Sequence, residues 1–354
     1  MVLCRLRINL LPILVLLSDF QFIRDRKFEV LGAITRGQYM KIRKFQLEQD
    51  LDNLEAYLRN QYLVNRNMTS WLPERLHDLI YRMDTQHTDR GKKKSVDYIF
   101  LWERDKEIVA CILPDGDAIY MSIKNGYEYL FNDILEYSEK NCLPLFEIEK
   151  DGTIDFLVIA NDSLTYRQDA LIHSGYKKQA EEDYDNYVFP LEISVSVDLP
   201  KGLKLLYGEE YDDEENKWSA CNLGFHPDLE APDYRNGMNP YNSRKNSSLY
   251  KDSFECLVID ENSQERNNVC SYCFVYVDKV SKTAFIEPVS TREKYRHQGV
   301  GIAMMHGVML RCRELGIEKC YVNSYDWRRQ FYNAAGFVTE DSIGFWHKTL
   351  KQKC

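Results

Sequence analysis

The stretch of this chain with the clearest chemical content is a basic, glycine-containing segment between a predicted strand and a predicted helix. Residues 285–301 read FIEPVSTREKYRHQGVG, and a helical pattern follows directly. Gly299 and Gly301 stand at the start of that helix, where free backbone N–H groups and the helix dipole favour an anion such as a phosphate. Arg296 and His297 add positive charge beside them, in a chain of formal net charge −9. The segment therefore predicts a phosphate-binding loop.

This pattern, Arg296-x-x-Gly299-x-Gly301, resembles the pyrophosphate loop of the coenzyme A site in the GNAT superfamily of N-acetyltransferases. The likeness continues downstream of the loop. Residues 319–325 have the composition of a strand, and residues 331–337, FYNAAGF, resemble the ending of the family's final helix. Together these segments make the C-terminal part of the chain similar to a GNAT domain.

A second likeness concerns the strand that leads into the loop. Glu287-Pro-Val-Ser-Thr291 is similar to the lead-in of a GNAT subgroup in which two such domains lie in tandem. Two positions depart from the family patterns: Arg292-Glu293 stands where that subgroup often has histidine-proline, and the helix after Tyr325 lacks the usual opening asparagine. The departures leave the cofactor prediction intact, but the acceptor is not assigned by analogy.

The resemblance implies that acetyl-CoA is the co-substrate, that no metal takes part, and that an acetyl group passes directly to a primary amine of a small molecule or peptide. It assigns the thioester carbonyl and the pantetheine amides to the backbone of Val289 and Thr291. It assigns the pyrophosphate to the Arg296 side chain and to the amides of the loop, which belong to His297, Gln298, Gly299, Val300, Gly301 and Ile302. A non-catalytic module that senses an acyl-CoA or a metabolite is the alternative function.

Amine acetylation needs a polarised thioester carbonyl, a base for the amine and an acid for the departing thiolate. Tyr332 stands where the family places its general acid, and a phenol with a pKa near 10 is protonated at neutral pH. Glu287 is the candidate base, since even spacing along a strand would put it on the same face as Val289 and Thr291. It could accept the proton directly or through water, or it could be a structural carboxylate that caps a neighbouring backbone. Both interpretations stay open.

The order of predicted elements suggests that the chain contains two domains. Its 354 residues are long enough for both. From Met40, and again after Pro190, strands and helices follow in the same order, which predicts an α/β unit used twice. We expect two tandem GNAT-like domains, each a mixed, mostly antiparallel sheet flanked by helices, with boundaries at 40–192 and 193–354.

The predicted first domain lacks the phosphate loop. Its corresponding strand-to-helix turn contains the single Gly126, no arginine three residues earlier, and the acidic Glu128. Counting back four residues from the glycine that ends each last helix gives Tyr332 in the second domain and Leu171 in the first. We therefore expect a degenerate first domain that walls one side of the substrate cleft, and one acetyl-CoA site per chain.

Composition limits the classes of partner. The net charge of −9 argues against general nucleic-acid binding, which needs an electropositive surface, whereas an acidic surface suits a cationic amine. The acidic run at 209–215 is expected to form a solvated helix face, or else a rim that attracts cations. The loop at 225–241 is long enough to shape specificity. We expect a monomer or a homodimer.

The ten cysteines are scattered along the chain. Cys270 and Cys273 have C-x-x-C spacing, but no second pair completes a zinc site. They fall in a predicted strand, where residues three apart point to opposite faces, so the two sulfurs are expected to diverge. Buried free thiols are predicted, as suits a reducing compartment.

The N-terminal segment contains an apolar run at residues 8–17, which is too short to span a bilayer, and no small-residue cleavage site follows it. The natural first strand is predicted at Met40–Phe45. We therefore expect residues 1–39 to be an extension outside the native fold, and the protein to be cytoplasmic, where acetyl-CoA is made, without stable membrane association.

Overall fold

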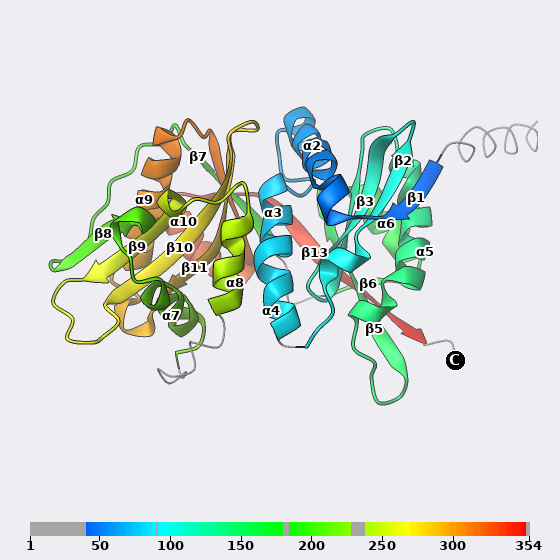
Figure 1. The fold of residues 1–354 in the computed structure, drawn as a ribbon. Helices are drawn as coiled ribbons and strands as arrows, with labels where there is room; N and C mark the ends of the chain where they lie inside the picture. Colours follow the sequence, from blue (N-terminus) through cyan, green and yellow to red (C-terminus); the bar gives the residue numbers. More distant parts are fainter. Residues whose placement is uncertain (1–39, 90, 180–183, 228–237, 352–354) are drawn as a thin grey trace, which may run out of the picture.

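The computed structural model describes residues 40–89, 91–179, 184–227 and 238–351. The predicted extension at 1–39 and much of the loop at 225–241 lie outside these ranges. Within the described residues, thirteen strands form one mixed sheet with helices on both faces (Figure 1). No helix in these ranges is long and apolar enough to cross a bilayer.

The first half of the chain supplies seven strands to this sheet. In chain order its elements are β1 (Met40–Lys44), α2 (Leu47–Asn65), α3 (Pro73–Asp78), the π-helical segment η1 (Leu79–Met83), α4 (Asp84–Asp89), β2 (Phe100–Arg104), β3 (Glu107–Asp115), β4 (Ala118–Ile123), α5 (Phe131–Asn141), β5 (Thr153–Asn161), α6 (Thr165–His173), β6 (Lys177–Lys178) and β7 (Tyr184–Pro190). Helices α3 and α4 and the segment η1 follow one another without a break between the two halves of the molecule (Figure 1).

The second half repeats the order and carries the predicted loop. Its elements are β8 (Leu203–Tyr207), α7 (Glu214–Phe225), α8 (Met238–Ser243), β9 (Glu255–Asp260), β10 (Val269–Asp278), β11 (Thr283–Thr291), α9 (Val300–Glu314), β12 (Lys319–Tyr325), α10 (Arg329–Ala334) and β13 (Val338–Lys351). The predicted mixed α/β class is confirmed, and the strand predicted at 319–325 is found with the same bounds.

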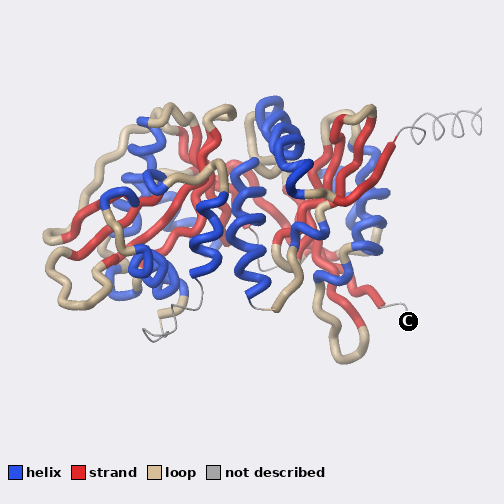
Figure 2. The backbone as a smooth tube through the Cα atoms, in the orientation of Figure 1, coloured by secondary structure: helices blue, strands red, loops and turns tan. Residues whose placement is uncertain are grey.

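The two halves exchange their last strands. The sheet order is β1-β2-β3-β4-β5-β13-β7-β12-β11-β10-β9-β8, and β6 also pairs with β13. Strand β13, from the end of the chain, pairs antiparallel with β5 of the first half, with Phe345 opposite Ile159. Strand β7 pairs antiparallel with β12 of the second half, with Asn186 opposite Asn323. Figure 2 shows the strands of the two halves on either side of the central helices, and Figure 1, in the same orientation, shows β13 passing behind α3 toward the first half. Neither half completes its own sheet.

The sheet opens at two places, one in each half. The parallel pairs β4–β5 and β11–β12 are the only parallel neighbours among the described strands. In the second half, β11 and β12 are paired from Thr283 opposite Lys319 to Phe285 opposite Tyr321. The pairing ends there, although β11 continues to Thr291 and β12 continues to Tyr325. The strands therefore separate toward their carboxyl ends and leave a split in the sheet.

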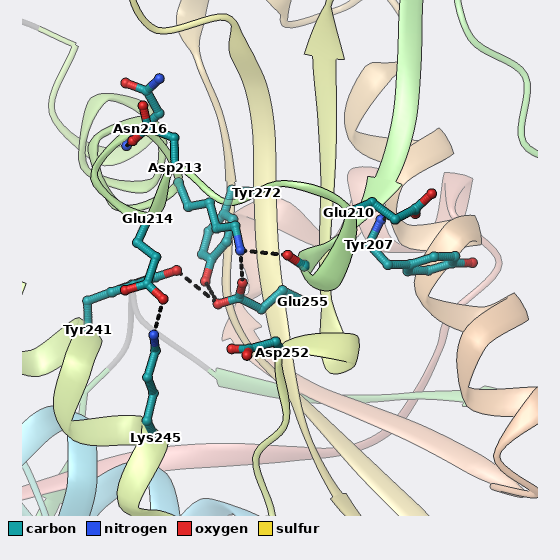
Figure 3. A network of polar contacts seen from close by, with 12 residues as sticks. Tyr207, Glu210, Asp213, Glu214, Asn216, Tyr241, Lys245, Asp252, Glu255 and Tyr272 are labelled. Atoms are coloured by element: carbon teal, nitrogen blue, oxygen red, sulfur yellow. Dashed lines mark hydrogen bonds and ion pairs between the residues drawn. The ribbon is translucent and has the colours of Figure 1, made fainter.

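A buried ion network fixes helix α7 to the sheet beside this split (Figure 3). Glu255, which is fully buried, accepts from Lys217 Nζ at 2.9 Å and pairs with Arg244. Three tyrosine hydroxyls also donate to this carboxylate, from Tyr241 at 3.2 Å, Tyr250 at 2.9 Å and Tyr272 at 2.7 Å. A buried charge is tolerated when it is paired and hydrogen-bonded. Here one carboxylate forms ion pairs with two buried cations, Lys217 and Arg244.

The two cysteines of the C-x-x-C pair do not diverge as predicted. Cys270 and Cys273 are both buried and free, which agrees with the expected chemistry, but both belong to the core cluster that packs against α9. The pairing of β10 with β9 shifts register between Val269 and Ser271, so β10 carries one extra residue there. A bulge of this kind interrupts the alternation of side chains between the two faces of the sheet. The side chain of Cys270 therefore lies on the same face as that of Cys273.

Candidate active site

The split between β11 and β12 opens onto a cavity of about 610 Å³ at the start of helix α9. Most of the residues predicted for the cofactor line this cavity: Val289, Thr291, Arg296, His297, Gly299, Val300, Gly301 and Ile302, together with the predicted acid Tyr332. The two other predicted site residues lie elsewhere. Gln298 points back along the loop and donates to the carbonyl of Lys294 at 2.8 Å, and Glu287 lines a different cavity.

The backbone of the loop has the shape that an anion site needs. Gly299 is the N-cap of α9 with φ +80°, and His297 also has a positive φ of 59°. A β-carbon on Gly301 would lie 3.0 Å from Thr291 Oγ1 and 3.1 Å from the Phe331 ring, so the backbone passes close to both walls of the cavity. The first amides of a helix have no partner within it, and here they lie at the cavity.

Arg296 is held differently from the prediction. Its Nε donates to the carbonyl of Thr291 at 3.0 Å, and its Nη2 donates to the carbonyl of Gly224 at 2.5 Å. The guanidinium therefore ties the loop to the end of β11 and to the C-terminal turn of α7. It lines the cavity at the same time, so positive charge stays beside the predicted pyrophosphate position.

Gly299 provides a direct test of the loop. We expect Gly299→Val to lower acetyl-CoA affinity at least about tenfold, because a β-branched residue strains a left-handed backbone by roughly 1–2 kcal/mol and its side chain would enter the predicted phosphate position. Gly316→Val is the matched control, since Gly316 has a similar φ of +76° and open space around it just past the other end of α9. Calorimetry with both variants separates loop chemistry from backbone strain: equal losses of affinity would contradict the assignment.

Tyr332 projects from α10 into an aromatic setting at the split. Its side chain is 3% exposed, and its ring stacks on Tyr187 with 4.6 Å between the centroids. Burial raises the pKa of Tyr332 to about 12, and a hydrogen bond with Ser324 partly opposes that shift. The hydroxyl therefore stays protonated across the neutral range and can act as a proton donor.

Glu287 lies on the other side of the split from the phosphate loop. The pairing of β10 with β11 matches Val275 to Ile286 and Cys273 to Val289, so β11 has one extra residue between these pairs. Because of this bulge, the side chains of Glu287 and Val289 do not lie on the same face of the sheet, although even spacing predicts that they would. Val289 lines the predicted cofactor cavity, whereas Glu287 lines a second cavity of about 300 Å³ between the two halves. The expectation of a shared face was wrong at this residue.

The environment of Glu287 is partly built by the first half. Arg82 Nη2 lies 3.3 Å from the Glu287 carboxylate, and the Nε and Nη2 of Arg82 donate to the carboxylate of Asp78 at 2.6 and 2.7 Å. Burial raises the pKa of Glu287 to about 7, the positive charge of Arg82 opposes this, and the negative charge of Asp78 adds to it. The negative charge of Glu287 in turn raises the pKa of Tyr332, so the two groups lie within electrostatic reach of each other across the split.

The corresponding split in the first half is filled by the chain itself. Arg167, only 2% exposed, donates to the carbonyl of Met121 at 2.8 Å, just past the end of the β4–β5 pairing. The turn before α5 is likewise occupied, since the amide of Gly126 donates to the carboxylate of Glu128 at 2.9 Å. Leu171 is fully buried at the position that corresponds to Tyr332. Within the described residues, these contacts occupy the positions of the first half that correspond to the glycine-containing loop and to Tyr332.

Several residues that shape the site carry no local signal in the sequence. Arg75 and Asp78 lie on α3, which packs against β10 and β11, and Arg82 lies on η1, which packs against α8 of the second half. Such placement depends on contacts between residues some 200 positions apart, and a local pattern carries no trace of it.

Comparison with known proteins shows that the fold is similar to that of GNAT acetyltransferases. Residues 218–337 match the family model described as the acetyltransferase (GNAT) family. The solved structure of a GCN5-related N-acetyltransferase from Sphaerobacter thermophilus has a TM-score of 0.57 and 14% identity, covering 89% of this chain and 97% of that one. A tandem GNAT protein from the clavulanic acid biosynthesis pathway has a TM-score of 0.58 and 12% identity, covering 89% of this chain and 100% of that one. No curated protein matches the sequence significantly.

Proposed function

We propose that this protein transfers an acetyl group from acetyl-CoA to a primary amine, because residues 218–337 match the acetyltransferase (GNAT) family model and the fold is similar to that of a tandem GNAT protein. The observation that carries the proposal is the split between β11 and β12. A phosphate loop and Tyr332 lie on one side of it, and the carboxylate of Glu287 lies on the other. An acid and a base with separated environments at one opening are the arrangement that acyl transfer to an amine needs.

The proposed reaction is a direct transfer. Acetyl-CoA supplies the thioester, held by the amides at the start of α9 and by the β11 backbone at Val289 and Thr291. The amine nitrogen attacks the carbonyl carbon, so a C–N bond forms and the C–S bond breaks. Glu287 takes the proton that the amine loses, directly or through one water. The Tyr332 hydroxyl gives a proton to the departing sulfur.

The charge state of Glu287 gives the proposal a pH dependence. A carboxyl with a pKa of about 7 is protonated below that pH, where it cannot accept a proton, and ionised above it. We therefore expect kcat/KM to rise with pH through about 7, and Glu287→Gln to lower turnover by roughly 10²–10⁴-fold and remove this limb. Thiol release from acetyl-CoA across a panel of amines, with mass spectrometry of the acetylated product, provides the measurement.

Two outcomes of that experiment would count against the proposal. Binding of acetyl-CoA at one site per chain without thiol release for any amine would favour the non-catalytic sensor. Turnover that is unchanged in Glu287→Gln, with the same pH profile, would remove Glu287 from the mechanism and leave it as a structural partner of Arg82.

A further inference from the structure

The cavity that Glu287 faces is built from both halves of the chain and has mainly apolar walls. Five aromatic side chains line it: Trp71 from the first half, Tyr184 and Phe345 from the exchanged strands, and Phe285 and Tyr325 from the second half. Its volume of about 300 Å³ lies at the lower end of the range for small-molecule sites, roughly 300–1,000 Å³. Such a cavity suits a small molecule with an apolar body better than an extended peptide.

The two positive charges in this cavity are already paired with the protein's own acceptors. Arg75 bridges Asp115 of the first half and Asn323 of the second, and its guanidinium lies 4.8 Å from the centre of the Trp71 ring. Arg82 is held by Asp78 and Glu287. A carboxylate on a substrate would thus find each of these guanidinium groups engaged.

The negative charges in the cavity exceed the positive ones. Four carboxylates line it, Asp78, Asp115, Asp117 and Glu287, against the two guanidinium groups of Arg75 and Arg82. Carboxylates and aromatic faces both attract an ammonium group. An acceptor that carried a carboxylate next to its amine would instead bury a negative charge among negative charges, which disfavours binding.

We propose that this cavity is the acceptor site and that it selects small primary amines with an apolar, ring-bearing body and no carboxylate beside the amine. The inference rests on the proposed acetyl transfer and adds the class of acceptor to it. The amine points toward Glu287 at the split, and the body of the molecule lies among the aromatic side chains of both halves. The first half, whose own split is filled, thereby acts as the specificity-determining wall.

Matched acceptors test the class. Phenylalanine amide and phenylalanine share the ring and the position of the amine, and they differ in the charge of one neighbouring group. We expect kcat/KM for the amide to exceed that for phenylalanine by about 30-fold or more, the effect of leaving one charge unpaired in a buried site. Phenylethylamine should likewise exceed ethylamine at least tenfold, because a ring fills the apolar walls.

A pair of variants tests the reason for the selection. Asp115→Asn releases Arg75 from its carboxylate, so a substrate carboxylate can pair with it, and the ratio between the two phenylalanine acceptors should fall by about tenfold. Asp117→Asn removes the same charge at the rim, where the side chain is 66% exposed and pairs with Lys92 at 3.5 Å, and should change that ratio less than threefold. Acetyl-CoA affinity, measured on both variants, reports whether the second half stays folded.

The possible results distinguish a failure of the proposed acetyl transfer from a failure of the proposed acceptor class. If no amine is acetylated although acetyl-CoA binds, the proposed function fails, and the acceptor class fails with it. If amines are acetylated but phenylalanine is used as well as its amide, the selection is wrong while the function stands. An equal change of the ratio in both variants would show that Arg75 has no part in the discrimination. Should Asp115→Asn fail to fold, Arg75→Gln replaces it, and there the ratio is expected to rise because the cavity loses a positive charge.

Discussion

Replacing Tyr332 with phenylalanine is expected to lower turnover by roughly 10²–10⁴-fold, the usual contribution of a general acid. The substitution removes one hydroxyl and keeps the ring, so the stacking on Tyr187 and the contacts with Phe331 and Phe337 persist. Acetyl-CoA affinity should change by less than about threefold, because the hydroxyl meets the sulfur strongly only as negative charge develops there.

The neighbouring phenol provides the control for this variant. Tyr187 is fully buried, stacks on Tyr332, and donates its hydroxyl to Asp185 at 2.9 Å. Tyr187→Phe therefore removes a buried hydrogen bond beside the site, and it should lower the melting temperature while turnover stays near that of the native chain. If Tyr332→Phe behaves in the same way, Tyr332 is a packing residue and the thiolate takes its proton from water or from the substrate.

The largest expected effect on stability belongs to Glu255. In Glu255→Gln the buried Arg244 and Lys217 lose their shared carboxylate, and each remains inside the protein with its charge unpaired. Breaking a buried ion pair by removing one partner costs about 3–5 kcal/mol, so we expect the free energy of unfolding to fall by that amount in urea titrations.

A second carboxylate in the same region allows a like-for-like comparison (Figure 3). Glu214 pairs with Lys245 near the surface, where their side chains are 39% and 34% exposed. Glu214→Gln makes the same chemical change and should cost less than about 1 kcal/mol, as exposed pairs do. Similar losses in the two variants would mean that the Glu255 network contributes no more than a surface pair.

Local patterns were enough to predict the mixed α/β class, the glycine-containing turn at the start of α9 and the strand at 319–325. The loop at 296–301 combines glycines, charge and a helix start within a few residues, and all of these signals act at short range. The alternation rule failed where a strand carried an extra residue: the bulge at Cys270 brought two thiols to one face, and the bulge after Ile286 separated Glu287 from Val289. A bulge depends on pairing with a neighbouring strand, which the sequence of one strand does not show.

Features that depend on distant partners were not predicted. The two exchanged strands, β7 and β13, pair with each other and with β12 and β5, all across long separations in sequence. The same holds for Arg75 and Arg82, which act on the second half from the first. The side chains that line the cavity between the two halves are therefore brought together only in the folded chain, whereas the glycine-containing loop before α9 lies within one short segment of sequence.

The strand exchange also sets the order in which the chain can finish folding during synthesis. The edge of β5, which ends at Asn161, stays open until β13, which ends at Lys351, has been made. At roughly 5–20 residues per second, ribosomes need about 10–40 s to add the residues in between. For that time the nascent chain exposes an unpaired strand edge, the kind of surface that chaperones protect from aggregation. It also follows that the first half cannot be removed without cost to the second, because strand β12 of the second half pairs with β7.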